Sequence, residues 1–190
     1  MTPNRLRAAL ALAALVLTAQ VPAPAATPVG WCATIPLPLA DFTSVRSDVD
    51  TQTIHRPREL PCRPLEVRTR RATLRLAVAA DTPTRERGLM KVPFVPVGQG
   101  MLFAFPDGDL KRSFWMKNTI AALDMIFVNA DGTVTAVAAD VPATAPGTPD
   151  DQVARRDGTG RYVIELGAGE AARLGIAAGE RLFIPAVSAR

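Results

Sequence analysis

Histidine is almost absent from this sequence, because the chain of 190 residues contains a single one, His55. Serine and cysteine hydrolases need a histidine base beside the nucleophile, and His55 precedes the segment in which regular strand patterns begin. We therefore expect no Ser-His-Asp or Cys-His machinery inside the core. The HExxH, Walker and dinucleotide-binding motifs are missing as well. Any catalysis would have to use carboxylates, hydroxyls, Lys117 or Tyr162.

Long helical runs are also lacking. Beyond the N-terminus no periodic apolar run exceeds a few turns, and 17 prolines and 13 glycines are spread along the chain. Hydrophobic residues make up 48% and charged residues 21%, which is ordinary globular usage. This composition excludes a coiled coil, a polytopic membrane protein and full-length disorder. It predicts one core of about 100 to 150 residues with appendages, built from short strands and turns.

The N-terminus has the layout of a secretory signal. Arg5 and Arg7 precede an uncharged stretch at residues 8–18, and residues 23–25 (Ala-Pro-Ala) have the small side chains that a signal peptidase reads. The stretch is about half of the ~20 residues needed to span a bilayer, so we expect no transmembrane anchor in the mature chain. We predict that residues 1–25 are removed and that the protein is periplasmic or extracellular. Losing Arg5 and Arg7 lowers the net charge from +4 to +2, and no nucleic-acid partner is expected.

Two cysteines, Cys32 and Cys62, lie in an irregular extension at residues 26–64. In an oxidising compartment an even number of cysteines predicts a disulfide, here closing a loop of about 31 residues and contributing on the order of 3.5 kcal/mol. A zinc site is the alternative. Cys32, Cys62 and His55 supply three ligands where structural zinc takes four, so we expect no metal and no cofactor.

A single β domain is predicted for residues 65–190. Alternating apolar residues and turn signals predict strands at 73–78, 101–105, 113–116, 123–128, 133–138, 161–166 and 181–184, and short helices at 83–87 and 170–174. The dipeptide Asp131-Gly132 is typical of a hairpin turn, and residues 142–160 are expected to form a long loop. Strands about every ten residues favour an antiparallel sandwich or partly open barrel, mainly β, with two short helices.

Several motifs in this domain resemble the domain of unknown function 192 family over about residues 66–185. They are Gly88-Leu89-Met90, Gly100-Met101-Leu102-Phe103 with Phe105, Phe114-Trp115-Met116-Lys117-Asn118-Thr119, Leu123-Asp124 with Ile126-Phe127, Asp131-Gly132, and Val163-Ile164-Glu165-Leu166 with Ala168-Gly169. Ala122 and Lys91 stand where the family usually has Pro and Arg. The resemblance implies a compact, mainly β sandwich or half-barrel, often exported by bacteria, with no established reaction or ligand.

The Phe-Trp-Met-Lys-Asn-Thr segment carries the candidate binding residues. Trp115, Lys117, Asn118 and Thr119 run from a strand into a turn, and Asp124 begins the next strand. An aromatic plate beside an ammonium, an amide and a carboxylate suits a sugar or another polar ligand. The alternative is structural, with Trp115 in the core, Lys117 paired with Asp124, and Asn118 and Thr119 satisfying turn amides.

The sequence leaves two further chemistries open. Asp124 and Glu165 would serve as an acid/base pair on a glycosidic bond if the fold brought them within about 5 to 10 Å. A structural ion pair of Glu165 with Arg87 is the alternative for a buried glutamate. Thioethers bind Cu(I), although gap-filling in the core is their ordinary role; the methionines concerned are Met90, Met101, Met116 and Met125.

The sequence therefore predicts an exported β domain that binds a small polar or carbohydrate ligand, or serves as an envelope accessory module. A carboxylate-dependent hydrolase acting on an envelope glycan is the alternative function, and a purely structural domain is the third. No catalytic motif is recognisable, so a non-enzymatic role is favoured. The oligomeric state is open.

Overall fold

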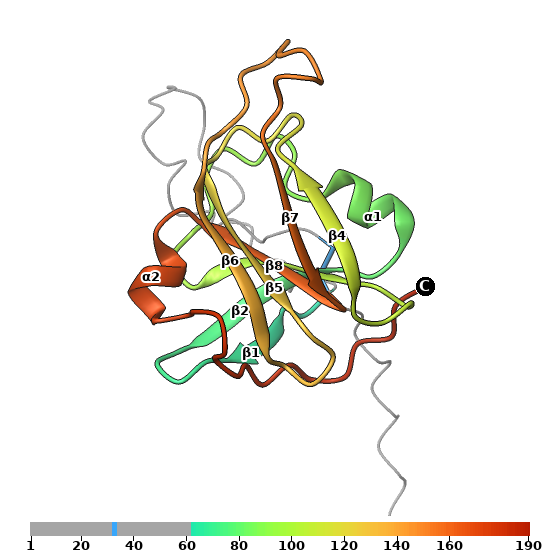
Figure 1. Cartoon of the computed structure of the whole chain (residues 1–190), viewed down its shortest axis with the longest axis vertical. Coiled ribbons are helices and arrows are strands. Elements are labelled where there is room, and N and C mark those ends of the chain that lie inside the picture. Colours follow the sequence, from blue (N-terminus) through green and yellow to red (C-terminus); the bar gives the residue numbers. More distant parts are fainter. Residues whose placement is uncertain (1–31, 34–61) are drawn as a thin grey trace, which may run out of the picture.

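The computed structural model describes residues 32–33 and 62–190 (Figure 1). The predicted signal peptide, most of the extension and His55 lie outside the described residues. Within the described part, no helix is long and apolar enough to cross a membrane.

Eight strands and two short helices make up the described domain (Figure 1). In chain order they are β1 (Leu65–Arg68), β2 (Thr73–Ala79), α1 (Thr82–Arg87), β3 (Gln99–Ala104), β4 (Leu110–Trp115), β5 (Leu123–Val128), β6 (Val134–Val141), β7 (Arg155–Gly160), β8 (Tyr162–Gly167) and α2 (Glu170–Leu174). The mainly β prediction with two short helices is confirmed.

The strands form a six-stranded sheet in the order β1-β2-β3-β8-β5-β6 and a separate two-stranded sheet of β4 and β7. Every pairing is antiparallel except that of β2 with β3, which is parallel. A parallel pair needs a crossover connection, and α1 with the loop at 88–98 provides it. The expectation of antiparallel strands is therefore corrected at this one pair.

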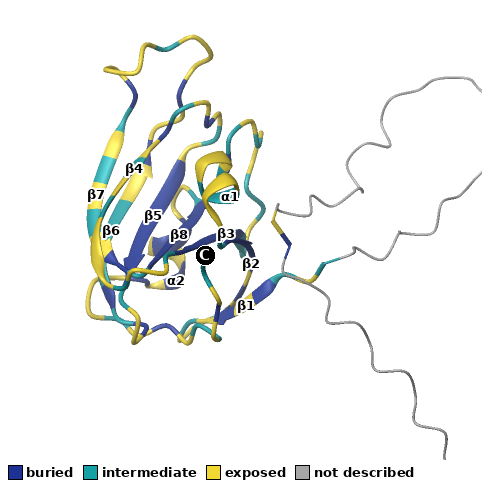
Figure 2. Cartoon of the chain, turned by 90° about the vertical axis from the view of Figure 1, so that its right-hand side faces the viewer, coloured by how far each residue is buried: buried dark blue, intermediate teal, exposed yellow. Residues whose placement is uncertain are grey.

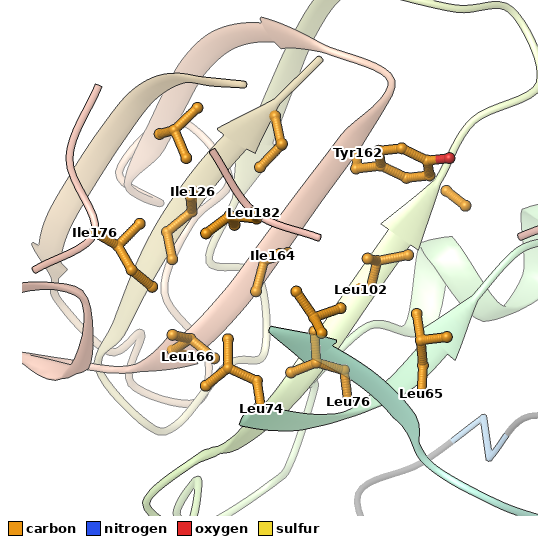
Figure 3. Close-up of a cluster of buried hydrophobic side chains, with 14 of the residues drawn as sticks. Leu65, Leu74, Leu76, Leu102, Ile126, Tyr162, Ile164, Leu166, Ile176 and Leu182 are labelled. Carbon is orange, nitrogen blue, oxygen red and sulfur yellow. The ribbon is translucent and has the colours of Figure 1, made fainter. Parts of the chain in front are cut away.

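Both faces of the large sheet are covered, which explains why β5 has six consecutive buried residues instead of alternating ones. One face holds Leu102, Ile126 and Ile164 together with α2 and the segment that follows it (Figure 3). The other face holds Phe103 and Phe127 and packs beneath β4 and β7. Figure 2 shows the contrast between buried β5 and β8 and the alternately exposed β4 and β7.

Local sequence signals account for α1 and for the position of β7. Asp81 and Thr84 form a capping box, with the Thr84 backbone N–H donating to Asp81 Oδ1 at 2.9 Å, and Gly88 ends the helix. At the β7 position Gly158, a Cβ atom would collide with the Phe127 ring, so glycine allows this strand to lie close on β5.

Three segments differ from the sequence predictions. Strand β1 lies in a segment where no strand was predicted, and β7 occupies the end of the predicted loop at 142–160. The predicted strand at 181–184 forms two isolated bridges, Thr133 with Arg181 and Arg68 with Phe183. Strand β1 has only four residues, although buried Leu65 and Val67 alternate with exposed Glu66 and Arg68, and β7 is polar. The segment at 181–184 alternates as expected of a strand but pairs at single residues only.

The predicted disulfide between Cys32 and Cys62 is confirmed. Cys32 is buried; its backbone N–H donates to the Arg63 carbonyl at 3.0 Å and its carbonyl accepts from the Val78 N–H at 2.7 Å. The extension is thus fastened to β2 at this residue.

Candidate functional site

Two adjoining cavities lie between α1 and β4, and we call them together the α1–β4 cleft. The inner cavity has a volume of about 40 Å³ and the outer one about 220 Å³. Both are lined by Arg85, Glu86, Phe103, Phe114 and Trp115. The cleft therefore has a small part and a wider part along the helix.

An aromatic cluster forms the floor of this cleft. The Phe114 ring, on β4, packs edge-on against the rings of Phe103, Phe105 and Phe127, with centroid distances of 4.9, 6.2 and 6.1 Å. Such edge-to-face pairs have defined geometry and fix the rings relative to one another. The floor is thus a preformed apolar surface.

Glu165 lies at the inner end of the cleft. It is 5% exposed, stands on β8 opposite Met101 of β3 and Met125 of β5, and lines the inner cavity. Its side chain forms no hydrogen bond or ion pair with any residue that the structure describes, and burial alone raises its pKa to about 8. At neutral pH the carboxyl group is consequently protonated, with one O–H to donate and a carbonyl oxygen to accept.

Trp115 and Lys117 stand near the opening. Trp115 is 37% exposed, and the Arg155 guanidinium lies 4.7 Å from its ring centroid. Lys117 is half-buried, forms an ion pair with Asp150 of the loop between β6 and β7, and has its Nζ atom 6.0 Å from the Trp115 ring. Trp115 is therefore a partly exposed ring with the Arg155 guanidinium over it and the Lys117 ammonium nearby.

Thr119 and Asn118 have different positions. Thr119 is buried, lines the inner cavity, and donates from Oγ1 to the Lys117 carbonyl at 3.2 Å. Asn118 is exposed and is not among the lining residues; its φ of 54° is left-handed and its Nδ2 atom lies 3.8 Å from Met90 Sδ. Asn118 shapes the turn that presents its neighbours to the cleft, a conformation that Asn tolerates better than most residues.

Asp124 lies outside the cleft. It is fully buried; Oδ1 accepts from the N–H groups of Asp140 at 2.9 Å and Gly169 at 3.2 Å, and Oδ2 accepts from Ala171 N–H at 2.8 Å. The carboxylate thereby ties β5 to β6 and to the first turn of α2. The ion pair expected between Lys117 and Asp124 is not formed, because Lys117 contacts Asp150 instead.

The register places Asp124 and Glu165 on opposite faces of the large sheet. Asp124 pairs with Leu166 and Met125 with Glu165, and neighbouring residues of a strand point to opposite faces. The two carboxyl groups proposed as a hydrolytic pair are thus separated by the sheet.

Arg87 and Glu165 both line the inner cavity, yet no ion pair joins them among the residues described. Of the four methionines considered as copper ligands, Met90 lines the cavity, while Met101, Met116 and Met125 are buried together in the core around Phe127. Arg85, Glu86 and Phe114 also line the cleft but were not predicted as site residues. The available signals were the charged side chains of the predicted helix at 83–87 and the position of Phe114 directly before Trp115.

A family model described as DUF192, "Uncharacterized ACR", matches residues 65–184. The chain belongs to this family. The matched region of the DUF192 domain contains every cleft residue named above. No curated protein matches the chain.

Two solved structures are similar to the DUF192 domain. One, from Sinorhizobium meliloti 1021 and described as a candidate transcription regulator, is 32% identical, with 64% of this chain and 92% of that chain covered and a TM-score of 0.54. The other, a protein of unknown function from Novosphingobium aromaticivorans DSM 12444, is also 32% identical, covers 63% of this chain and 83% of that chain, and has a TM-score of 0.51.

Proposed function

We propose that this protein is an exported binding module that holds a small polar ligand in the α1–β4 cleft. The observation that carries the proposal is Glu165, a buried carboxyl group that has no hydrogen-bond partner among the described residues and lines a cavity continued by an aromatic groove. Because no described residue hydrogen-bonds this carboxyl group and it lines the cavity, it is available to a ligand that enters there. Perturbed, unpaired groups of this kind are concentrated at functional sites.

The volume of the cleft limits the size of the ligand. Its two cavities measure about 40 and 220 Å³, at or below the lower end of the ~300 to 1,000 Å³ typical of pockets for drug-sized ligands. We therefore infer a ligand no larger than a monosaccharide or a single substituted ring. Trp115 provides a flat surface against which such a ring stacks.

Export is the second part of the proposal. The Cys32 to Cys62 disulfide supports it, since disulfides persist in oxidising compartments. Intact-mass measurement of protein taken from the periplasm, with and without reductant, tests both the disulfide and the removal of residues 1–25. Protein that retains the signal or carries two free thiols would contradict this part.

A thermal-shift screen tests the binding role. We expect one or more compounds among hexoses, N-acetylhexosamines, nucleosides and small carboxylates to raise the melting temperature, since a ligand at 100 times its Kd adds about 2.7 kcal/mol. The shift should be lost in Trp115→Ala and kept in Phe183→Ala, which removes an exposed aromatic side chain outside the cleft. A screen without hits, or an equal shift in both variants, would contradict the proposal.

A further inference from the structure

We propose that the ligand of the α1–β4 cleft is a small carboxylic acid, with its carboxylate in the inner cavity and its apolar body in the outer cavity. This inference rests on the binding role proposed above and names the class of ligand. It is carried by the size of the inner cavity, the charges of its walls and the position of Glu165.

The inner cavity has room for one small functional group. Its volume is about 40 Å³, and a cavity needs roughly 10 to 15 Å³ to hold a water molecule on the same measure. About three non-hydrogen atoms fit, which is the size of a carboxylate group. A sugar ring is too large for this end of the cleft and is confined to the outer cavity.

Cations outnumber anions on the walls of the inner cavity. Arg85, Arg87 and Lys117 line it, against Glu86 and the protonated Glu165. Arg85 already donates to the Ala104 carbonyl at 3.0 Å. The Arg87 guanidinium has no partner among the residues that the structure describes, and it is the cation available to an incoming carboxylate.

The outer cavity suits an apolar body. Four aromatic side chains form most of its lining, and the polar or charged residues Thr82, Arg85, Glu86 and Ser113 complete it; the aromatic ones are Phe103, Phe105, Phe114 and Trp115. A ring or short chain placed there gains from burial of apolar surface, by roughly 25 cal/mol per Å² removed from water. A ligand with one anionic end and one apolar end therefore matches both cavities.

The proton on Glu165 determines whether an anion is accepted. Its neutral carboxyl group donates an O–H to the ligand carboxylate, a short charge-assisted hydrogen bond, whereas the ionised group repels an anion. The charged groups that face it are Arg85, Glu86 and Arg87 from α1 and Lys117 from the turn after β4. The neighbouring strands β3 and β5 present Met101 and Met125, which do not titrate.

Benzoate is the probe for this inference, and benzyl alcohol is its uncharged analogue. Affinities for the disulfide-bonded chain are measured by following the backbone amides of Gly88 and Thr119 during NMR titrations at pH 6.5 and 9.5. We expect benzoate to bind at least about tenfold more tightly than benzyl alcohol at pH 6.5, the effect of one charge-assisted contact. Its affinity should fall about 30-fold at pH 9.5, because Glu165 ionises near pH 8 while benzoate keeps its charge.

Two variants distinguish the effect of Glu165 ionisation from that of a neighbouring carboxylate. Glu165→Gln keeps a hydrogen-bond donor and cannot ionise, so benzoate affinity at pH 6.5 should stay within about threefold of the parent and become independent of pH. Glu86→Gln removes the exposed carboxylate of the same cleft and should leave the pH dependence in place.

Equal binding of benzoate and benzyl alcohol, an affinity that does not change with pH, or a Glu165→Gln variant that keeps the parent's pH dependence would overturn the inference. If a neutral hexose binds and benzoate does not, the inference fails while the proposed binding role stands. If neither these probes nor any compound of the thermal-shift screen binds, both fail.

Discussion

The buried carboxyl group of Glu165 makes the stability of the protein depend on pH in a window where few other groups titrate. Its pKa lies at about 8 in the folded chain, against an ordinary value of 4.5. Between these two values the folded state keeps a proton that the unfolded state has lost. Stability contributed by this proton is full below pH 4.5, decreases as pH rises, and is gone above about pH 8.

The magnitude follows from the same two values. One pH unit corresponds to about 1.4 kcal/mol per proton, so the parent should lose about 3 kcal/mol of unfolding free energy between pH 5.5 and pH 9 relative to Glu165→Gln. The variant has a similar shape and no ionisable group at this position. Its stability curve therefore serves as the reference.

Denaturant unfolding at pH 5.5, 7, 8 and 9 measures this difference, with Glu86→Gln as the control for an exposed carboxylate. The carboxyl groups whose pKa hydrogen bonds or ion pairs lower titrate below this range; they are Asp81, Asp107, Asp131, Asp157 and Glu170. Their contribution is lost only as pH falls below their ordinary values, and it cancels in the comparison. A difference between parent and Glu165→Gln that stays constant within about 0.5 kcal/mol from pH 5.5 to 9 would show that the Glu165 pKa is not raised in the folded protein.

Three further predictions concern the fold and are checked by denaturant unfolding. Asp124→Ala should lower the unfolding free energy by about 3 to 5 kcal/mol, because it leaves three backbone N–H groups without their acceptor. Asp157→Ala removes only an exposed ion pair with a lysine and should leave the unfolding midpoint nearly unchanged. Equal losses in the two variants would contradict the role of Asp124. Phe127→Ala should lower the unfolding free energy by about 3 to 5 kcal/mol, because this fully buried ring packs against β7. A loss below about 1 kcal/mol would be inconsistent with that packing. Reducing the Cys32 to Cys62 disulfide should lower stability by about 3.5 kcal/mol, and an unchanged midpoint would show that the cross-link does not constrain the unfolded chain.

Elements defined by local chemistry were predictable from the sequence. The predicted helix at 83–87 corresponds to α1, because Asp81, Pro83 and Gly88 are start and stop signals that act within a few residues. The hairpin around Asp131-Gly132 was identified for the same reason, since the turn and the flanking apolar strands are adjacent in the chain.

Features that depend on distant residues were not predictable. Strand β7 is polar and rich in glycine, and its position is explained by contact between Gly158 and Phe127. The partners of Asp124 are backbone amides of β6 and α2, which no residue pattern indicates. For the cleft, Trp115 and Lys117 were found because an aromatic and a charged residue adjoin a turn, whereas its wall on α1 became apparent only from the fold.

Direct titration of the Glu165 carboxyl group by NMR, with and without benzoate, is the sharpest test of the proposed site. We expect this resonance to titrate near pH 8 in the free protein. Because the neutral form binds the anion, adding benzoate should move the midpoint to higher pH. A midpoint near the ordinary value of 4.5, or a midpoint unaffected by benzoate at saturating concentration, would contradict the assignment of Glu165 as the group that receives the ligand.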